Sequence, residues 1–175
     1  TKGQEWYNSD EWLAVGSEVK LWYGAVVERE MLLELNLIRN GMDGHLLPSI
    51  GQLFTIRQLD LSFNKNLRGN LPEEIGHLRS LKILKLCGCS FEGLLPETIG
   101  NLVELRELKL SGNRFCGGLP KNLSNLVRLR ELCLNSNDFT GKIPVSLSQL
   151  VSIRVLDLSD NHMTGSIPDQ LGALI

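Results

Sequence analysis

The chain has 175 residues, 42% of them hydrophobic, and a formal net charge of −2 at pH 7. This length suits one well-buried domain, and the small charge favours neither nucleic acid nor an anionic membrane surface as a partner. No stretch approaches the roughly 18 uninterrupted apolar residues of a transmembrane helix, so we expect no membrane span in this chain.

Residues 1–30 differ from the rest and are predicted to form an N-terminal cap. They hold all three tryptophans of the chain. Asn8, with Glu11 three residues later, is typical of the start of a short helix that Gly16 would end. Residues 22–28 are predicted to be extended and to turn into the next strand. Because a terminal repeat cannot bury its apolar face alone, we expect the aromatic side chains to cover the end of a core. The alternative is an aromatic ligand site.

From residue 31 to residue 175 one pattern recurs six times, with a period of 24 residues except for 25 in the second unit. Leu129–Leu150 shows it as L-x-x-L-x-L-x-x-N-x-F-x-G-x-I-P-x-x-L-x-x-L. The leucines on either side of Cys133 have the period of two that predicts a short strand with one buried face. Asn137 ends the strand, and Gly141 and Pro144 mark the return path.

These repeats resemble the leucine-rich repeat family, and the tail G-x-[IL]-P-x-x-[IL]-[GS]-x-L resembles its plant-type subclass of 24 residues. Trp22–Leu37 is similar to the cap that precedes such arrays, but Val27 or Glu28 stands where that cap usually has a cysteine. The resemblance implies an α/β repeat: a right-handed leucine-rich repeat solenoid with a parallel concave β-ribbon, a cap over 1–30 and six repeats over 31–175. No C-terminal cap follows in the sequence, so we expect a fragment or trimmed product whose open end is covered by a neighbouring domain or subunit.

An asparagine recurs where each predicted strand ends, and Cys89 takes its place in the third unit; the set is Asn40, Asn64, Asn113, Asn137 and Asn161. Buried backbone groups need hydrogen-bond partners, so we expect this ladder to satisfy them at the bend rather than to bind a ligand. The glycines are expected to allow a tight return, and the prolines to make the convex side extended.

The residues that alternate with the buried leucines are predicted to face the concave surface. We expect a protein partner to bind there, on Glu34, Asn36, Gln58, Asp60, Phe63, Ile83, Lys85, Glu107, Lys109, Glu131, Cys133, Val155 and Asp157. Phe63 is the one exposed aromatic candidate, and aromatic anchors dominate many interfaces. Basic residues recur where the strands start, at Arg57, Lys82, Arg106, Arg130 and Arg154. They are interpreted either as a solvated edge neutralised by neighbouring glutamates or as a docking surface for an acidic protein segment.

No pattern predicts catalysis. His45, His77 and His162 are separated from nucleophiles and carboxylate pairs, and no glycine-rich phosphate loop follows a strand. Cys87-x-Cys89 lacks the second ligand pair of a zinc site. We therefore expect a protein that is not an enzyme and that needs no metal or cofactor.

The four cysteines help to predict whether the protein is intracellular or extracellular. Cys87 and Cys133 are predicted to lie two strands apart, about 9–10 Å, which is beyond the reach of a disulfide. Free thiols favour an intracellular protein, whereas the tripeptide Asn122-Leu123-Ser124 is a glycosylation sequon, a pattern that this repeat's N-L-S usage readily produces, and it favours an extracellular one. We expect an intracellular protein-protein interaction scaffold. The alternative is a ligand-sensing ectodomain of a membrane receptor.

Overall fold

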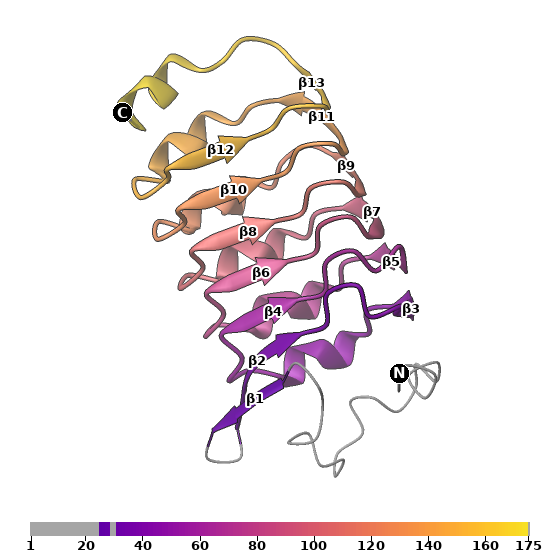
Figure 1. Ribbon diagram of the computed structural model, residues 1–175. Coiled ribbons are helices and arrows are strands. Elements are labelled where there is room, and N and C mark those ends of the chain that lie inside the picture. The colour runs from indigo at the N-terminus through magenta and orange to yellow at the C-terminus, as the bar shows by residue number, and fades with distance from the viewer. Residues whose placement is uncertain (1–24, 29–30, 175) are drawn as a thin grey trace.

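A computed structural model describes residues 25–28 and 31–174. The chain winds into a solenoid whose turns stack from the N-terminal to the C-terminal end (Figure 1). The predicted capping helix and the aromatic side chains of the cap lie outside the described residues, so the cap and its boundary at residue 30 stay predictions.

One sheet of seven strands forms the concave side, in the order β1-β2-β4-β6-β8-β10-β12. Its strands are β1 (Ala25–Glu28), β2 (Met31–Asn36), β4 (Gln58–Asp60), β6 (Ile83–Lys85), β8 (Glu107–Lys109), β10 (Glu131–Cys133) and β12 (Val155–Asp157). β1 pairs with β2 in antiparallel fashion, and all later pairs are parallel. This confirms the parallel ribbon, and of the extended segment predicted over residues 22–28 it confirms residues 25–28.

A second sheet of six strands follows the bend, in the order β13-β11-β9-β7-β5-β3. Its strands are β3 (Asp43–His45), β5 (Asn66–Asn70), β7 (Ser90–Leu94), β9 (Arg114–Gly117), β11 (Asp138–Lys142) and β13 (His162–Thr164). The repeat pattern did not predict this sheet, because its strands carry glycine and charged residues rather than alternating apolar ones.

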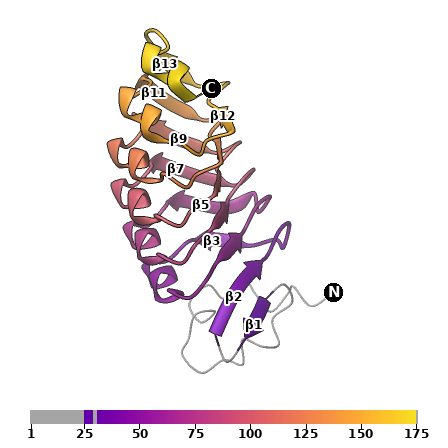
Figure 2. The ribbon, with the colours of Figure 1, turned by 90° about the vertical axis from the view of Figure 1, so that its left-hand side faces the viewer.

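Each turn then passes through a short 3-10 helix, and these helices stack in a file along one side of the solenoid (Figure 2). They are η3 (Pro48–Gln52), η4 (Glu73–His77), η5 (Glu97–Asn101), η6 (Lys121–Asn125), η7 (Val145–Gln149) and η8 (Asp169–Leu174). The expectation of an extended convex side is therefore wrong, and the helical part of the predicted α/β repeat is 3-10. Proline fixes φ near −65° and so suits the start of a helical turn: Pro48 opens η3, and Pro72 is the N-cap of η4.

The core is one continuous stack of leucine and isoleucine side chains running through the solenoid. Phe91, Phe115 and Phe139 form a spine inside it, with successive ring centroids 6.1 and 6.2 Å apart and nearly parallel planes. These rings are fully buried. Large buried aromatic side chains contribute strongly to stability, so the spine holds consecutive repeats in fixed register.

The asparagine ladder is confirmed. Asn64 shows the pattern: its Nδ2 donates to the carbonyls of Leu37 (2.9 Å) and Leu61 (2.7 Å). Its Oδ1 accepts from the backbone N–H groups of Asn40 and Met42 at 2.9 and 3.1 Å. Asn113, Asn137 and Asn161 make equivalent bonds, so these four asparagines join neighbouring repeats through backbone groups that the sheet leaves unpaired, which is a structural role.

Candidate functional site

The concave sheet brings the predicted partner-binding residues into shared rows. Glu34, Gln58, Ile83, Glu107, Glu131 and Val155 occupy equivalent positions on successive strands. Of the thirteen predicted residues, those exposed to solvent are Glu34, Asn36, Phe63 and Val155. Those half-buried are Gln58, Ile83, Lys85, Glu107, Lys109, Glu131, Cys133 and Asp157. The remaining one, Asp60, is buried with 5% of its surface exposed.

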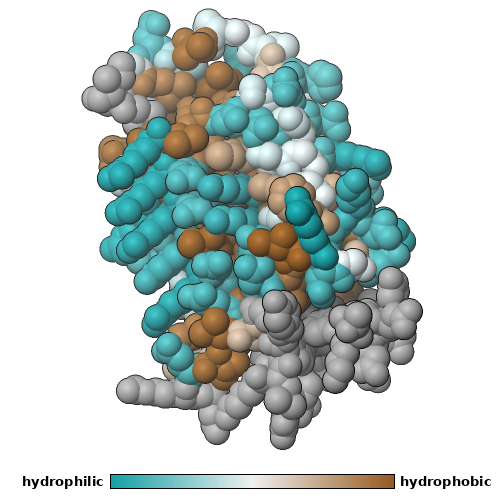
Figure 3. All heavy atoms as spheres, in the orientation of Figure 1, coloured by the Kyte–Doolittle hydropathy of each residue, from teal (hydrophilic) through white to brown (hydrophobic). Residues whose placement is uncertain are grey.

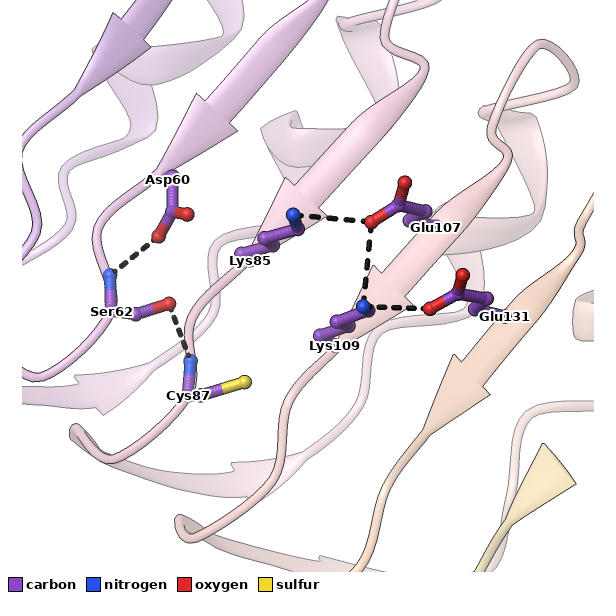
Figure 4. A network of polar contacts seen from close by, with 7 residues as sticks. All are labelled: Asp60, Ser62, Lys85, Cys87, Glu107, Lys109 and Glu131. Carbon is purple, nitrogen blue, oxygen red and sulfur yellow. Dashed lines mark hydrogen bonds and ion pairs between the residues drawn. The ribbon is translucent and has the colours of Figure 1, made fainter. Parts of the chain in front are cut away.

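The middle of this surface is a chain of alternating charges across β6, β8 and β10 (Figure 4). Lys85 Nζ lies 3.1 Å from Glu107 Oε2, which is also 3.5 Å from Lys109 Nζ. Lys109 Nζ then lies 2.6 Å from Glu131 Oε2. We call these four residues the charge chain. Because each charge has an opposite neighbour, the side chains are held in place before any partner arrives.

The pair at the end of the charge chain is the most strongly coupled. The hydrogen bond from Lys109 holds the pKa of the Glu131 carboxyl below its ordinary value. The same bond raises the pKa of Lys109 above its ordinary value. Both groups therefore stay charged across the physiological pH range, and the pair is a permanent polar feature of the surface.

Asn36, Asp60 and Asp157 occupy the equivalent last position of their strands and support the backbone there. Asp60 Oδ1 accepts from the N–H of Ser62 at 3.0 Å, and Asp157 Oδ1 accepts from the N–H of Ser159 at 3.1 Å. Asn36 Oδ1 accepts from the N–H of Ile38 at 3.3 Å. An Asx side chain that bonds two residues ahead fixes a turn. The recurring tripeptide D-L-S is the sequence signal of this bond, and it indicates a structural role for Asp60.

Phe63 lies just past β4 and is 48% exposed, as expected for an anchor. Its backbone has φ of +63°, which is unusual for a bulky residue. The guanidinium carbon of Arg39 sits 5.0 Å from the ring centroid, and a Cβ on Gly88 would come within 2.7 Å of the ring. Arg39 and Gly88 could not be predicted as neighbours of Phe63, because the contact joins three different repeats.

The cysteines are free, as predicted, within the described part of the chain. Burial raises the pKa of the Cys87, Cys89 and Cys133 thiols above their ordinary value. A thiol with a raised pKa is rarely a thiolate at neutral pH and reacts slowly with oxidants and other thiols. Free cysteines of this kind can persist in an oxidising compartment, so they carry little information about location.

Within residues 25–28 and 31–174, no group of three or more His, Cys, Asp or Glu side chains is arranged to hold a metal ion. A search of the same residues for a helix with the length and hydropathy of a membrane span finds none.

Comparisons with known proteins place the chain among receptor-like relatives. A family described as "Leucine-rich repeat region" matches residues 26–174. A stretch of 52 residues is 48% identical to the probable LRR receptor-like serine/threonine-protein kinase RPK1 of Arabidopsis thaliana, covering 30% of this chain and 9% of that protein.

Two solved plant structures extend the likeness over most of the chain. The ectodomain of the membrane receptor kinase GASSHO1/SCHENGEN3 from Arabidopsis thaliana, in complex with CASPARIAN STRIP INTEGRITY FACTOR 2, is 35% identical with a TM-score of 0.87. The match covers 90% of this chain and 19% of the GASSHO1/SCHENGEN3 chain. The plant peptide hormone receptor RGFR1, in complex with RGF2, is 35% identical with a TM-score of 0.66. That match covers 82% of this chain and 27% of the RGFR1 chain. The chain thus spans a small part of each relative's length.

These likenesses overturn the expectation of an intracellular protein. The GASSHO1/SCHENGEN3 structure is the ectodomain of a membrane receptor kinase, and RPK1 is described as receptor-like. The expectation failed because it took unpaired cysteines to indicate a reducing compartment, whereas the raised pKa of three of the four thiols lowers their reactivity.

Proposed function

The chain belongs to the leucine-rich repeat proteins, since the family matches residues 26–174, and from this premise we propose that it is the ligand-sensing part of a receptor ectodomain. Its concave face recognises an extracellular peptide. The observation that carries the proposal is the charge chain, set in the middle of a rigid ribbon that resembles the ribbons of ligand-bound plant receptors.

Pre-organisation is what makes the charge chain suitable for recognition. Side chains that are already fixed lose little conformational entropy on binding, so more of the interaction energy appears as affinity. Lys85 and Lys109 offer donors, and Glu107 and Glu131 offer acceptors, on adjacent strands about 4.8 Å apart. A peptide that crosses the strands meets alternating charge, which favours a ligand with complementary polar groups.

Phe63 adds an apolar anchor at the far end of the strands. Its ring is half exposed while Arg39 and Gly88 hold it in place, so a ligand side chain can pack on it without first ordering it. A positive φ recurs at the equivalent position of other repeats, as at Arg39 and Ser136, so the repeat turn itself fixes the backbone that carries the ring. Binding, and not catalysis, is the activity that we propose for this surface.

An extracellular location is supported by the glycosylation tripeptide. Asn122 is exposed on η6, away from the concave sheet, so a glycan there would leave the charge chain uncovered.

The proposal is tested by peptide selection followed by charge inversion. A display library of random twelve-residue peptides is selected on the secreted, glycosylated chain, and the affinity of the best peptide is measured by calorimetry. The inverted variant carries Lys85→Glu, Glu107→Lys, Lys109→Glu and Glu131→Lys together. It keeps alternating charges, and so the fold, but reverses every polarity that a ligand would meet.

The matched control is Arg114→Glu with Asp138→Lys, which inverts exposed charges on the second sheet. We expect the inverted variant to bind at least tenfold more weakly and the control to bind like the natural chain. Equal affinity for all three proteins, or no enrichment of peptides over an uncoated surface, would contradict the proposal that the concave face binds a peptide.

A further inference from the structure

The turns that lead into the strands carry most of the molecule's uncompensated positive charge. We call five four-residue turns the basic edge: residues 54–57, 79–82, 103–106, 127–130 and 151–154, which precede β4, β6, β8, β10 and β12 (Figure 1). They contain seven basic residues and one acidic residue. Because the whole chain has a net charge of −2, the remaining residues carry a surplus of eight acidic side chains. The charge of the molecule is therefore strongly segregated.

The last residue of each turn is a cation, and the backbone fixes these five in one row. The N–H of Lys82 donates to the carbonyl of Arg57 at 2.8 Å, and that of Arg106 donates to Lys82 at 2.7 Å. The ladder continues through Arg130 and Arg154 at 2.8 Å each. Adjacent strands are about 4.8 Å apart, so five like charges lie within about 19 Å. Hydrophilic side chains gather at this edge of the strands in Figure 3.

Neighbouring glutamates do not neutralise this row. Glu107 and Glu131 pair with the lysines of the charge chain, and Glu104 pairs with Arg128. Within the part of the chain that the structure describes, none of the five row cations has a carboxylate partner within 4.0 Å. Like charges this close repel one another, and an anionic ligand would relieve that repulsion.

An apolar row runs beside the cations. The first residues of four of the turns are Phe54, Val103, Val127 and Val151, and each is exposed, Phe54 at 68% and Val151 at 76%. They lie three residues before the row cations, and an inward-facing leucine or isoleucine separates the two rows, buried in all of these turns except at Ile153, which is half-buried. Exposed apolar side chains gathered along one edge are typical of an interaction surface. Paired with a cationic row, they favour a ligand that is acidic and apolar at once.

We propose that the basic edge docks an extended acidic peptide segment of a partner protein, in which carboxylates alternate with apolar side chains. An extended segment of about six residues spans the 19 Å row. Its alternate side chains point to opposite sides, so one set meets the cations and the other meets the apolar row. This goes beyond the proposed function, because it is a second docking surface at the side of the concave sheet.

The test uses a fluorescein-labelled twelve-residue peptide in which Glu alternates with Val and Ala, with fluorescence anisotropy as the readout. The edge variant is Arg106→Gln, Arg130→Gln and Arg154→Gln. The matched control is Lys65→Gln, Arg114→Gln and Lys121→Gln, three exposed cations off the edge, so both variants have the same net charge. We expect the edge variant to bind about tenfold more weakly, since each exposed ion pair contributes modestly, and the control to stay within about twofold.

Three further arms complete the test. Binding should weaken steeply between 50 and 300 mM salt, about as expected for exposed charges. Substituting Val103, Val127 and Val151 by Ser should weaken binding of the Glu peptide at constant charge. The four-charge inversion of the concave face should leave this binding unchanged, which separates this proposal from the proposed function.

Equal binding of a peptide with Gln in place of Glu, or equal loss in the edge and control variants, would overturn the proposal. So would binding to phosphatidylserine vesicles or to polygalacturonate without binding to the Glu peptide, because the edge would then recognise a lipid surface or a polysaccharide.

Discussion

Replacing Asn113 with cysteine tests how the ladder holds the repeats together. Asn113 Nδ2 donates to the carbonyls of Leu86 and Leu110 at 2.8 and 2.9 Å, and its Oδ1 accepts from the N–H of Phe91 at 3.1 Å. A thiol can supply a donor, as Cys89 Sγ does towards the carbonyl of Leu61 at 3.3 Å. It is a poor acceptor, so the buried N–H of Phe91 would lose its partner.

The magnitude follows from these bonds. A buried polar group without a partner costs about 1–3 kcal/mol, and one lost carbonyl bond adds about 1 kcal/mol. We therefore expect Asn113→Cys to lower the free energy of unfolding by about 3 kcal/mol. For a chain of this size that corresponds to a fall in Tm of roughly 6–12 °C, measured by circular dichroism.

The natural cysteine provides the control. Cys89 lies in the third unit, and the backbone group that an asparagine there would accept from is the N–H of Leu67 in the second unit. That N–H already donates to the carbonyl of Asn64 at 2.9 Å, because the second unit is one residue longer. Cys89→Asn would add an acceptor that no backbone group needs, so we expect a change under about 1 kcal/mol. If Asn113→Cys and Cys89→Asn shifted Tm equally, the reasoning about the acceptor would be refuted.

Three other predictions concern the surface. Phe63→Gly should be about 1 kcal/mol more stable than Phe63→Ala in urea unfolding, because both lose the ring and only glycine relieves a φ of +63°; equal stability would show that the backbone is not strained. The pKa of Glu131 is lowered by Lys109, so the pair's stabilisation is present above the unfolded pKa of the carboxyl and is lost as pH falls through the lower folded value. Lys109→Met should therefore reduce stability by about 0.5 kcal/mol at pH 7 and by less towards pH 3, whereas a pH-independent difference would contradict this coupling. In plant secretory expression, Asn122→Gln should abolish the mobility shift caused by endoglycosidase treatment, and an unchanged shift would place the glycan elsewhere.

The scaffold was predictable because its constraints repeat in the sequence. The strand leucines fill the core in successive turns, and Asn64, Asn113, Asn137 and Asn161 bond the backbone in the way that the sequence predicted. The second sheet was not predictable, because backbone pairing between turns creates it from residues with no apolar period, such as those around Gly69. The 3-10 helices form instead from bonds within one turn, as between the N–H of Ile75 and the carbonyl of Pro72 at 3.0 Å, and the sequence analysis interpreted the prolines there as signs of an extended segment.

The surface was predictable only in part. Alternation placed Lys109 and Glu131 on the concave face, but their ion pair depends on rotamers set by neighbouring strands. Asp60 followed the same alternation and is buried, because its carboxylate serves the backbone of Ser62. Arg39 was missed since it reaches Phe63 from the preceding repeat. A side-chain contact that occurs once between two repeats, such as the one between Arg39 and Phe63, cannot be predicted from a recurring pattern.

The central claim is that this chain is the ligand-sensing ectodomain of a receptor, and the side of the membrane on which it lies tests that claim most directly. Intact plant protoplasts making the natural protein that contains this chain are treated with a membrane-impermeant biotin reagent, and peptides from residues 31–174 are identified by mass spectrometry. We predict biotin on exposed lysines such as Lys65 and Lys121 without permeabilisation. Labelling that appears only after the membrane is permeabilised would contradict the account.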